Sequence, residues 1–311
     1  MQSSDVILLG QSMDQLLQGL PVRISSPLQQ WATVRPDALA ACDHIGQVCN
    51  FRQLSQRVTA AQTFYRAQGV VAGDRVLLIN ENCVALLVAI LALSEIDAIS
   101  VVVNARLASA EIRRIQQHCQ PRLTVCLLDS QAAEAHWLAL QNEQLSEHVR
   151  LDGARLGLLM PETSVLPLDE SAMPVRERVC VMIYTTGTTG DPKGVMLTHR
   201  NILYVAAVTG VLRGMTAQDR ICCVLPISHI FGLAAVFLAA LYRGAALVLA
   251  DRFDPAAVLQ TLRDQHITGL LGVPTMYARL LEHTRAARML AADMPRLRFL
   301  YSGGAPLDPT I

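Results

Sequence analysis

The sequence of 311 residues carries 26 basic and 26 acidic side chains, so its formal net charge is zero. A chain of this length folds as one large domain or two smaller ones, with enough core to need neither disulfides nor metal. The balanced charge argues against a nucleic-acid-binding protein, which needs a basic surface. The 52% of hydrophobic residues excludes intrinsic disorder.

The apolar runs and the cysteines indicate a cytoplasmic protein without an integral membrane segment. The longest apolar run, Ile230 to Leu241, is shorter than the roughly 20 residues of a spanning helix. The N-terminus lacks the basic region and cleavage site of a secretion signal. Eight cysteines form no CxxC pair, which is typical of reduced thiols that fill a core. No spacing of His or Cys indicates a metal site in this chain.

Short apolar runs alternate with helical patterns along nearly the whole chain. This order predicts an α/β architecture with parallel-rich sheets covered by helices on both faces. The predicted strands are Arg75 to Ile79, Ser100 to Val103, Leu123 to Leu128, Cys180 to Tyr184, Ile221 to Leu225, Ala246 to Leu249 and Arg298 to Tyr301. Two stretches between strands, Asn82 to Leu93 and Ala110 to Cys119, are long enough for crossover helices. A further helix is predicted to start at Pro255, capped by Asp254, and to bury Val258, Leu259 and Leu262.

The amino-acid composition changes between Met160 and Arg178, where three prolines stand among acidic and small residues. Such a stretch predicts a connection between two halves. We therefore expect an N-terminal extension (1–30), a first α/β subdomain (31–175) and a second α/β subdomain (176–311).

The segment Tyr184 to Gly194, with the sequence YTTGTTGDPKG, directly follows a predicted strand. Its glycines allow main-chain N–H groups to converge on an anion, and its threonine hydroxyls add donors. Lys193 supplies the positive charge that a polyphosphate needs. The pattern predicts a phosphate-binding loop. The signature of a P-loop NTPase, GxxxxGK[ST], does not fit, because Pro192 and Gly194 stand where it requires glycine and Ser/Thr.

The segment resembles the signature of the adenylate-forming (AMP-binding) acyl-CoA synthetase superfamily, with Thr186 where serine is commoner. Further blocks resemble the family in order and spacing, and together they cover roughly residues 30 to 311. These blocks are RPDALA (35–40), GV at 69–70 with GDRV (73–76), NENC (80–83), MLTHRN (196–201), LPISHIFG (225–232), VPT (273–275) and SGGAPL (302–307).

The resemblance implies two similar stacked subdomains and ATP-dependent activation of a carboxylic acid. A carboxylate attacks the α-phosphorus of ATP to give an acyl-adenylate, and CoA then displaces AMP. Lys193 and His229 would be the catalytic residues, and Mg²⁺ would accompany ATP. The implied cofactor-binding residues are Thr185, Thr186, Gly187, Thr188, Thr189, Gly190, Lys193, Arg252, Gly303, Gly304, Ala305 and Pro306. The implied acyl-binding residues are His229, Phe231, Gly232 and Ala235.

The family's later motifs do not follow Ile311, among them the adenine-stacking segment and the C-terminal domain with its lysine. We therefore expect an N-terminal fragment, inactive alone and lacking the C-terminal domain of the same synthetase. Two alternatives are a nucleotide-binding remnant without turnover and an acyl-AMP ligase that delivers the acyl group to a carrier protein. A fatty acid ranks first as substrate and an aryl acid second. An amino acid ranks lower, because Ser228 and His229 stand where amino-acid-activating relatives carry a carboxylate.

Overall fold

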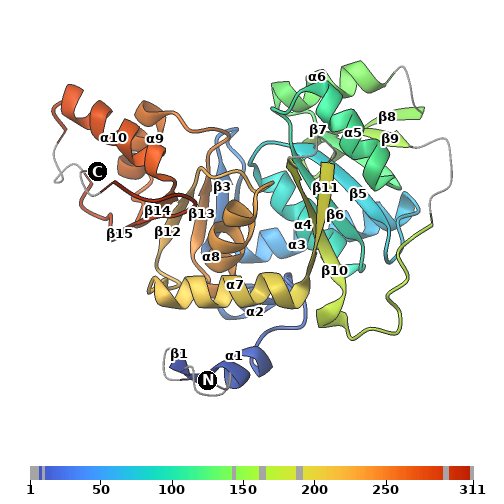
Figure 1. The fold of residues 1–311 in the computed structure, drawn as a ribbon, viewed down its shortest axis with the longest axis horizontal. Helices are drawn as coiled ribbons and strands as arrows, with labels where there is room; N and C mark the ends of the chain where they lie inside the picture. The colour runs from blue at the N-terminus through green and yellow to red at the C-terminus, as the bar shows by residue number, and fades with distance from the viewer. Residues whose placement is uncertain are drawn as a thin grey trace.

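The computed structural model describes residues 7–8, 11–141, 145–160, 166–186, 192–289 and 294–308 (Figure 1). Within these residues the chain forms two large sheets side by side and a small two-stranded sheet near the N-terminus. The small sheet pairs β1 (Ile7–Leu8) with β2 (Gln11–Ser12) and leads into α1 (Met13–Gln18). The mixed α/β class that the sequence predicts is confirmed.

The seven-stranded sheet has the order β11-β10-β6-β5-β7-β9-β8. Its strands are β5 (Arg75–Asn80), β6 (Ile99–Asn104), β7 (Leu123–Leu127), β8 (Leu145–Leu151), β9 (Ala154–Met160), β10 (Val179–Thr186) and β11 (Pro192–Thr198). The central strands β10, β6, β5 and β7 are parallel, whereas β11 and the pair β9–β8 run antiparallel at the two edges.

The six-stranded sheet has the order β15-β14-β12-β13-β3-β4. Its strands are β3 (Leu39–Asp43), β4 (Val48–Asn50), β12 (Arg220–Cys223), β13 (Ala246–Leu249), β14 (Gly269–Gly272) and β15 (Phe299–Ser302). All neighbours are parallel except β3 and β4. The carboxyl ends of β12, β13, β14 and β15 therefore meet at one edge, which is where ligands bind in sheets of this kind.

Helices form the layers around and between the two sheets. One large core lies between the sheets and contains α2 (Ser26–Val34), α3 (Phe51–Ala67), α4 (Val84–Glu95), α7 (His199–Leu212), the π-helix η3 (Phe231–Leu238) and α8 (Ala239–Arg243). The outer face of the seven-stranded sheet packs on α5 (Ser109–Cys119) and α6 (Gln131–Leu140), and the outer face of the six-stranded sheet packs on α9 (Pro255–Asp264) and α10 (Pro274–Ala286). A one-turn 3₁₀ helix, η2 (Val175–Glu177), precedes β10.

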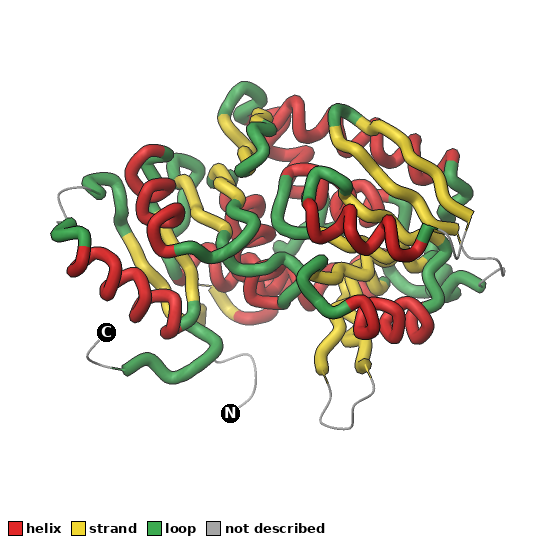
Figure 2. The backbone as a smooth tube through the Cα atoms, turned by 90° about the horizontal axis from the view of Figure 1, so that it is seen from above, coloured by secondary structure: helices red, strands yellow, loops and turns green. Residues whose placement is uncertain are grey.

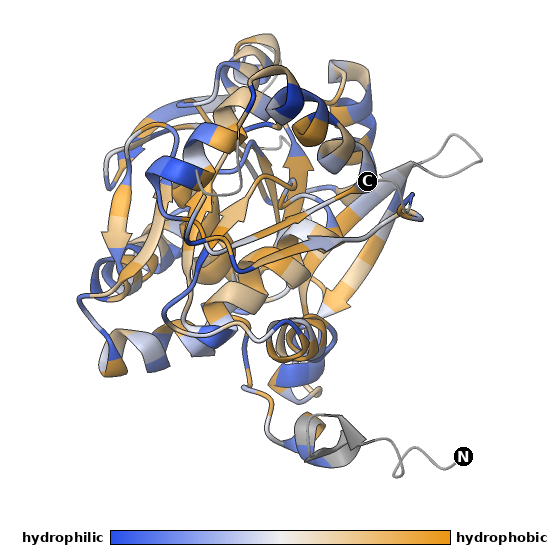
Figure 3. Ribbon diagram, turned by 90° about the vertical axis from the view of Figure 1, so that its left-hand side faces the viewer, coloured by the Kyte–Doolittle hydropathy of each residue, from blue (hydrophilic) through white to orange (hydrophobic). Residues whose placement is uncertain are grey.

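The side-chain alternation of a strand explains this layering. In β5, Val76 and Leu78 point into the core between the sheets, whereas Leu77 and Ile79 point toward α5 and α6. Both faces of the strand are buried, so its sequence reads as a continuous apolar run. Figure 3 shows the same distribution across the molecule, with apolar residues concentrated in the strands and on the inner sides of the helices.

Every strand and helix that the sequence predicts is present, with ends displaced by a few residues at most. The predicted cap is also confirmed, because the Asp254 side chain accepts a hydrogen bond from the Ala257 N–H and Val258, Leu259 and Leu262 are buried. The strands that the sequence analysis missed are β1, β2, β3, β4, β8, β9, β11 and β14. β14 was not predicted because its four residues include two glycines, which are uncommon in strands.

The two large sheets do not divide the chain at residue 175, because each contains strands from both sides of that position. β10 and β11 lie beyond that position but belong to the sheet of the first half, whereas β3 and β4 belong to the sheet of the second half. The expected extension also ends early, since Ile24 and Leu28 are fully buried in the central core. Strand pairing depends on neighbours in space, which the proline-rich connection does not reveal.

The eight cysteines are free, and seven of them are buried. Burial raises the pKa of every thiol, to about 11 for Cys83 and about 12 for Cys126, so these groups stay protonated at neutral pH. The prediction that the cysteines fill the core is confirmed for the seven that are buried. In the described part of the chain, none of the helices is long and apolar enough to cross a bilayer.

Candidate active site

The predicted phosphate loop sits at the end of an antiparallel hairpin. β10 pairs with β6 only as far as Ile183, and its last residues pair with β11 alone. In Figure 2 the paired ends of two strands project from the body of the molecule at this position. Thr185 stands opposite Lys193 and Thr186 opposite Pro192. Gly187, Thr188, Thr189 and Gly190 lie outside the described residues.

The ends of β10 and β11 that pair only with each other, Tyr184–Thr186 and Pro192–Gly194, form the hairpin stem. Its register places two predicted site residues together. Directly opposed residues of an antiparallel pair project on the same side of the ribbon, so the hydroxyl of Thr185 and the ammonium of Lys193 share one face. Both side chains are exposed. Lys193 is also the only lysine among the 311 residues, because all other basic side chains except histidine are arginines. The stem thus offers a donor and a cation beside the Gly/Thr-rich loop.

Tyr184 fixes the point where the stem leaves the sheet. Its hydroxyl lies 2.6 Å from Nδ1 of His118, in the last turn of α5, and the two rings meet edge to face. Its ring also covers Gly194 on the opposite strand, where a Cβ would come within 3.2 Å of the ring. Sequence reasoning missed His118, since nothing in the spacing of residues relates α5 to the loop.

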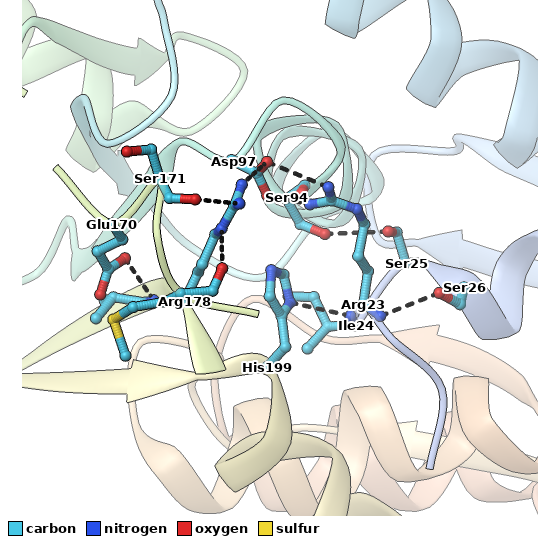
Figure 4. A network of polar contacts seen from close by, with 12 residues as sticks. Arg23, Ile24, Ser25, Ser26, Ser94, Asp97, Glu170, Ser171, Arg178 and His199 are labelled. Carbon is cyan, nitrogen blue, oxygen red and sulfur yellow. Dashed lines mark hydrogen bonds and ion pairs between the residues drawn. The ribbon is translucent and has the colours of Figure 1, made fainter. Parts of the chain in front are cut away.

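An ion-pair network holds the base of the same hairpin (Figure 4). Arg178, the residue before β10, donates from Nη1 to Oδ2 of Asp97 at 2.8 Å. Arg23 pairs with both oxygens of Asp97 from the other side. Asp97 has a left-handed backbone with φ of 57°, a conformation that aspartate tolerates better than most residues. Burial alone would raise the pKa of Asp97, but Arg23 and Arg178 outweigh it and hold the pKa below 3.8.

His199, the residue after β11, joins the network from the other strand. The side chain is fully buried, and its Nδ1 accepts a hydrogen bond from the Ile24 N–H at 3.2 Å. Burial first, and then the positive charge of Arg23, lowers the pKa of His199 to about 4. His199 is therefore neutral at physiological pH, and both ends of the hairpin are anchored to the segment around Arg23.

This pKa predicts how stability depends on pH. His199 titrates near 6.5 in the unfolded chain but near 4 in the folded one, so the unfolded chain binds more protons between these values. The stabilisation is complete above pH 6.5 and falls by about 3 kcal/mol as the pH drops toward 4. Urea unfolding of the wild type and of His199→Asn across this range measures the difference. The variant should lose most of the pH dependence above pH 4, and an unchanged slope would assign it to other groups.

The segment after β12 carries the predicted acyl-binding residues. Asn82 holds it in place: its side chain accepts from the Ile227 N–H at 2.9 Å and donates to the carbonyls of Cys223 and Leu225. Asn82 is buried and belongs to one of the motif blocks recognised in the sequence. A buried amide with several hydrogen bonds of this kind fixes backbone geometry.

A tight turn then presents His229 and Phe231. The His229 N–H donates to the Pro226 carbonyl at 3.0 Å, and Nδ1 of His229 accepts from the Phe231 N–H at 3.2 Å. The imidazole remains exposed. The Phe231 ring lies 3.1 Å from the position that a Cβ on Gly303 would occupy. The structure thus brings together the predicted segments that follow β12 and β15.

The segment Gly303 to Pro306 follows β15 and is largely exposed. The Gly303 N–H donates to the Gly272 carbonyl at 3.1 Å, and Gly304 adopts a positive φ of 84°. Val273, which follows β14, lies 3.5 Å from the Cβ position of Gly304. The two glycines allow a close turn at the carboxyl edge of the sheet.

Gly232 does not make room for a ligand, although the sequence predicts that it lines the acyl pocket. A Cβ at this position would lie 2.1 Å from the Pro226 carbonyl oxygen. The absence of a side chain therefore lets η3 pack against the turn that carries His229. Ala235, one turn further along η3, is buried and accepts a hydrogen bond at its carbonyl from Nη1 of Arg213.

The remaining predicted residue, Arg252, is exposed in the connection between β13 and α9. It lies at the carboxyl edge of the sheet, as do the segments after β12 and β15. Among the described residues, no hydrogen bond or ion pair joins Arg252 to another predicted site residue, and none joins the hairpin stem to the His229 turn. His, Cys, Asp and Glu side chains also form no metal-ligand cluster in the described ranges.

Comparison with known proteins identifies the family of this chain. Residues 28–311 match the model of the family described as AMP-binding enzyme. A feruloyl-CoA synthase of Amycolatopsis sp is 32% identical over 279 residues, which cover 89% of this chain and 53% of that protein. The 2-succinylbenzoate–CoA ligase of Bacillus licheniformis is 30% identical and is 54% covered, and the medium-chain fatty-acid–CoA ligase of Escherichia coli is 29% identical and is 51% covered.

Solved structures show the same fold. MatB of Rhodopseudomonas palustris in its apo form superposes with a TM-score of 0.73 at 23% identity, covering 92% of this chain and 55% of that one. The N-terminal domain of FACL13 from Mycobacterium tuberculosis gives a TM-score of 0.72 at 21% identity, covering 93% and 71%. The chain spans about half the length of the curated relatives that it matches. It belongs to the AMP-binding enzyme family, whose members with similar sequences are acyl-CoA ligases.

Proposed function

We propose that the protein containing this chain converts a carboxylic acid into its acyl-adenylate with ATP and then into a CoA thioester. The observation that carries the proposal is the pairing of Thr185 with Lys193 beside the Gly/Thr-rich loop. Similarity to relatives that are named as CoA ligases supports CoA as the acceptor of the acyl group. The match to the AMP-binding family supports an acyl-adenylate as the intermediate.

In the first step the acid carboxylate attacks the α-phosphorus of ATP and pyrophosphate leaves. Lys193 and the hydroxyl of Thr185 would bind the leaving phosphates, which gain negative charge as the bond breaks. Gly187, Thr188, Thr189 and Gly190 would add donors, as the motif implies. The exposed His229 would lie beside the reacting carboxylate, and the backbone of Gly303 to Pro306 would face the adenylate.

In the second step the CoA thiol attacks the acyl carbon and AMP leaves. Arg252 would meet the CoA nucleotide from the loop after β13. Mg²⁺ would neutralise charge on the ATP phosphates, but no cluster of His, Cys, Asp or Glu among the described residues fits a bound divalent ion. We therefore assign no step to a metal held by these residues.

The acid itself has an apolar body in this proposal. Phe231 and Ala235 are apolar residues of the segment after β12, which suits a fatty acid or an aryl acid. The sequence ranks the fatty acid first. The names of the relatives include both kinds, since one is a feruloyl-CoA synthase and another a medium-chain fatty-acid–CoA ligase.

Acid-dependent exchange between pyrophosphate and ATP tests the proposal. In the full-length protein, exchange that requires a carboxylic acid supports adenylation, and thioester formed on adding CoA distinguishes a CoA ligase from an acyl-AMP ligase that uses a carrier protein. Binding of ATP without exchange would identify a remnant that only binds nucleotide. Release of phosphate without any acid would contradict the proposal.

A second test measures ATP binding and acyl-CoA formation by the purified 311-residue chain alone. We propose that the residues that stack adenine and bind ribose in the family lie outside it. Each missing hydrogen bond to a charged group costs about 1.5–3 kcal/mol of binding free energy, so ATP should bind weakly. We expect no measurable acyl-CoA from the purified chain. Rapid acyl-CoA synthesis by the chain alone would show that residues described here as packing supply the missing roles.

A further inference from the structure

Arg213, the residue after α7, carries a half-buried charge without a carboxylate partner among the described residues. Its Nε is buried and has no hydrogen-bond partner among the described residues. Its Nη1 donates only a long bond, of 3.4 Å, to the Ala235 carbonyl. The guanidinium carbon lies 3.7 Å from the centre of the Tyr301 ring. No acidic side chain in the described part of the chain forms an ion pair with it.

Other partly buried arginines among the described residues have closer partners. Nη1 of Arg178 donates to Asp97 at 2.8 Å, and Nε of Arg243 donates to the Met215 carbonyl at 2.8 Å. For Arg213, by contrast, burial lowers the pKa, and the groups that partly offset this effect are tyrosines rather than carboxylates. A desolvated cation without a counter-charge is costly unless something else supplies the anion.

The position of Arg213 relates it to the predicted acyl pocket. Tyr301 lies on β15, and its ring comes 3.6 Å from the Cβ position of Gly303, beside which Phe231 packs at 3.1 Å. Leu300 and Ser302, on the opposite face of β15, line a separate apolar pocket of about 280 Å³ against α9 and α10. Arg213 thus stacks on the face of β15 that looks toward Phe231, not on the face toward α10.

A second contact leads from Arg213 to the same place. Ala235, whose carbonyl accepts from Arg213, lies one helical turn after Phe231 on η3. The guanidinium therefore contacts Ala235, which the sequence assigns to the acyl group, and also Tyr301, whose ring lies near Gly303 beside Phe231. His229 begins the same segment, so a substrate with its reacting carboxylate at His229 would extend past Phe231 toward Arg213.

Resting on the proposed function, we propose that Arg213 determines specificity by binding an oxygen at the far end of the acid substrate. The substrate class is an acid whose distal end carries an oxygen acceptor, most strongly a second carboxylate, rather than an unsubstituted fatty acid. A guanidinium binds carboxylate oxygens with paired, charge-assisted hydrogen bonds, and a phenol oxygen with a weaker one. Stacking on Tyr301 holds the guanidinium plane in place for this contact.

Matched acids test the assignment in the full-length protein. Octanoate is compared with octanedioate, and cinnamate with 4-hydroxycinnamate and 4-carboxycinnamate, by acid-dependent pyrophosphate exchange. The wild type should show a kcat/KM at least 10-fold higher for a distal carboxylate than for the matched plain acid. Arg213→Met, which keeps the length of the side chain, should remove this preference, with a 10- to 100-fold loss for the distal carboxylate and little change for the plain acid.

Two variants complete the design. Arg279→Met removes a guanidinium that lies 5.9 Å from the Phe253 ring on the exposed side of α10, and it should leave the ratio unchanged. Arg213→Lys keeps the charge without the planar fork and should retain part of the preference, which preserves the test if Arg213→Met does not fold. Equal kcat/KM for plain and distal-oxygen acids in the wild type, or an equal preference in Arg213→Met, overturns the assignment. Absence of exchange with every acid would instead overturn the proposed function.

Discussion

Replacing Lys193 with alanine is expected to lower the rate of pyrophosphate exchange about 100- to 1,000-fold, as the loss of one well-placed electrostatic donor does in other enzymes. The ammonium is the only lysine charge in the chain, and it stands opposite Thr185 on the hairpin stem. The side chain is exposed, so the free energy of unfolding should change by less than about 0.5 kcal/mol. Exchange kinetics and urea unfolding of the same preparation separate the two effects.

Arg285→Ala is the matched control, because Arg285 is an exposed cation in the last turn of α10. Its exchange rate should equal that of the wild type. Lys193→Arg keeps the charge but changes its reach, so we expect a partial loss between wild type and alanine. Exchange at the wild-type rate in Lys193→Ala would remove this residue from the site.

Replacing Gly232 with alanine should be the most destabilising single-methyl change in the site. The new Cβ would stand 2.1 Å from the Pro226 carbonyl oxygen and 2.9 Å from that of Leu225. Both neighbours are backbone and cannot turn away as a flexible side chain would, so the cost should be about 3 kcal/mol or more. The turn that carries His229 would move with them. We expect a large fall in the midpoint of urea unfolding together with loss of exchange.

Gly214→Ala distinguishes a clash from the general cost of replacing glycine. Gly214 has a positive φ of 58°, but no atom lies within 4 Å of its Cβ position. Its substitution should cost only the backbone strain, about 1 kcal/mol. If Gly232→Ala proved no more destabilising than Gly214→Ala, η3 would have room to move away from Pro226.

The sequence predicts the elements of this fold better than their partners. The apolar run of β5 and the cap at Asp254 are local signals, and the structure confirms both. The pairing of β3 with β13 joins residues about 200 positions apart in the sequence, and no local pattern indicates it. For the same reason the sequence suggests a division at residue 175 that the sheets cross.

The candidate site shows the same limit. Motifs identify Lys193, His229 and Gly303 because each lies in a short segment of distinctive composition. His118 and Arg213 lack such a context, and their relation to the site depends on side-chain contacts with Tyr184 and Tyr301. Gly232 shows a different error, since a small residue in a motif suggests space for a ligand, whereas the space is filled by the Pro226 carbonyl.

Because Lys193 is the only lysine in these 311 residues, limited proteolysis can be directed to the hairpin stem. Within these 311 residues a lysine-specific endoprotease has one peptide bond to cut, between Lys193 and Gly194 in the edge strand β11. A protease needs an extended segment freed from its partner strand, so the cleavage rate under native conditions reports the local opening of β11 from β10. Tyr184, bound to His118, opposes the residue just after that bond. The rate at which the uncut band disappears from a gel therefore measures the free energy of opening the stem, and the same measurement with ATP gives the change that ATP causes.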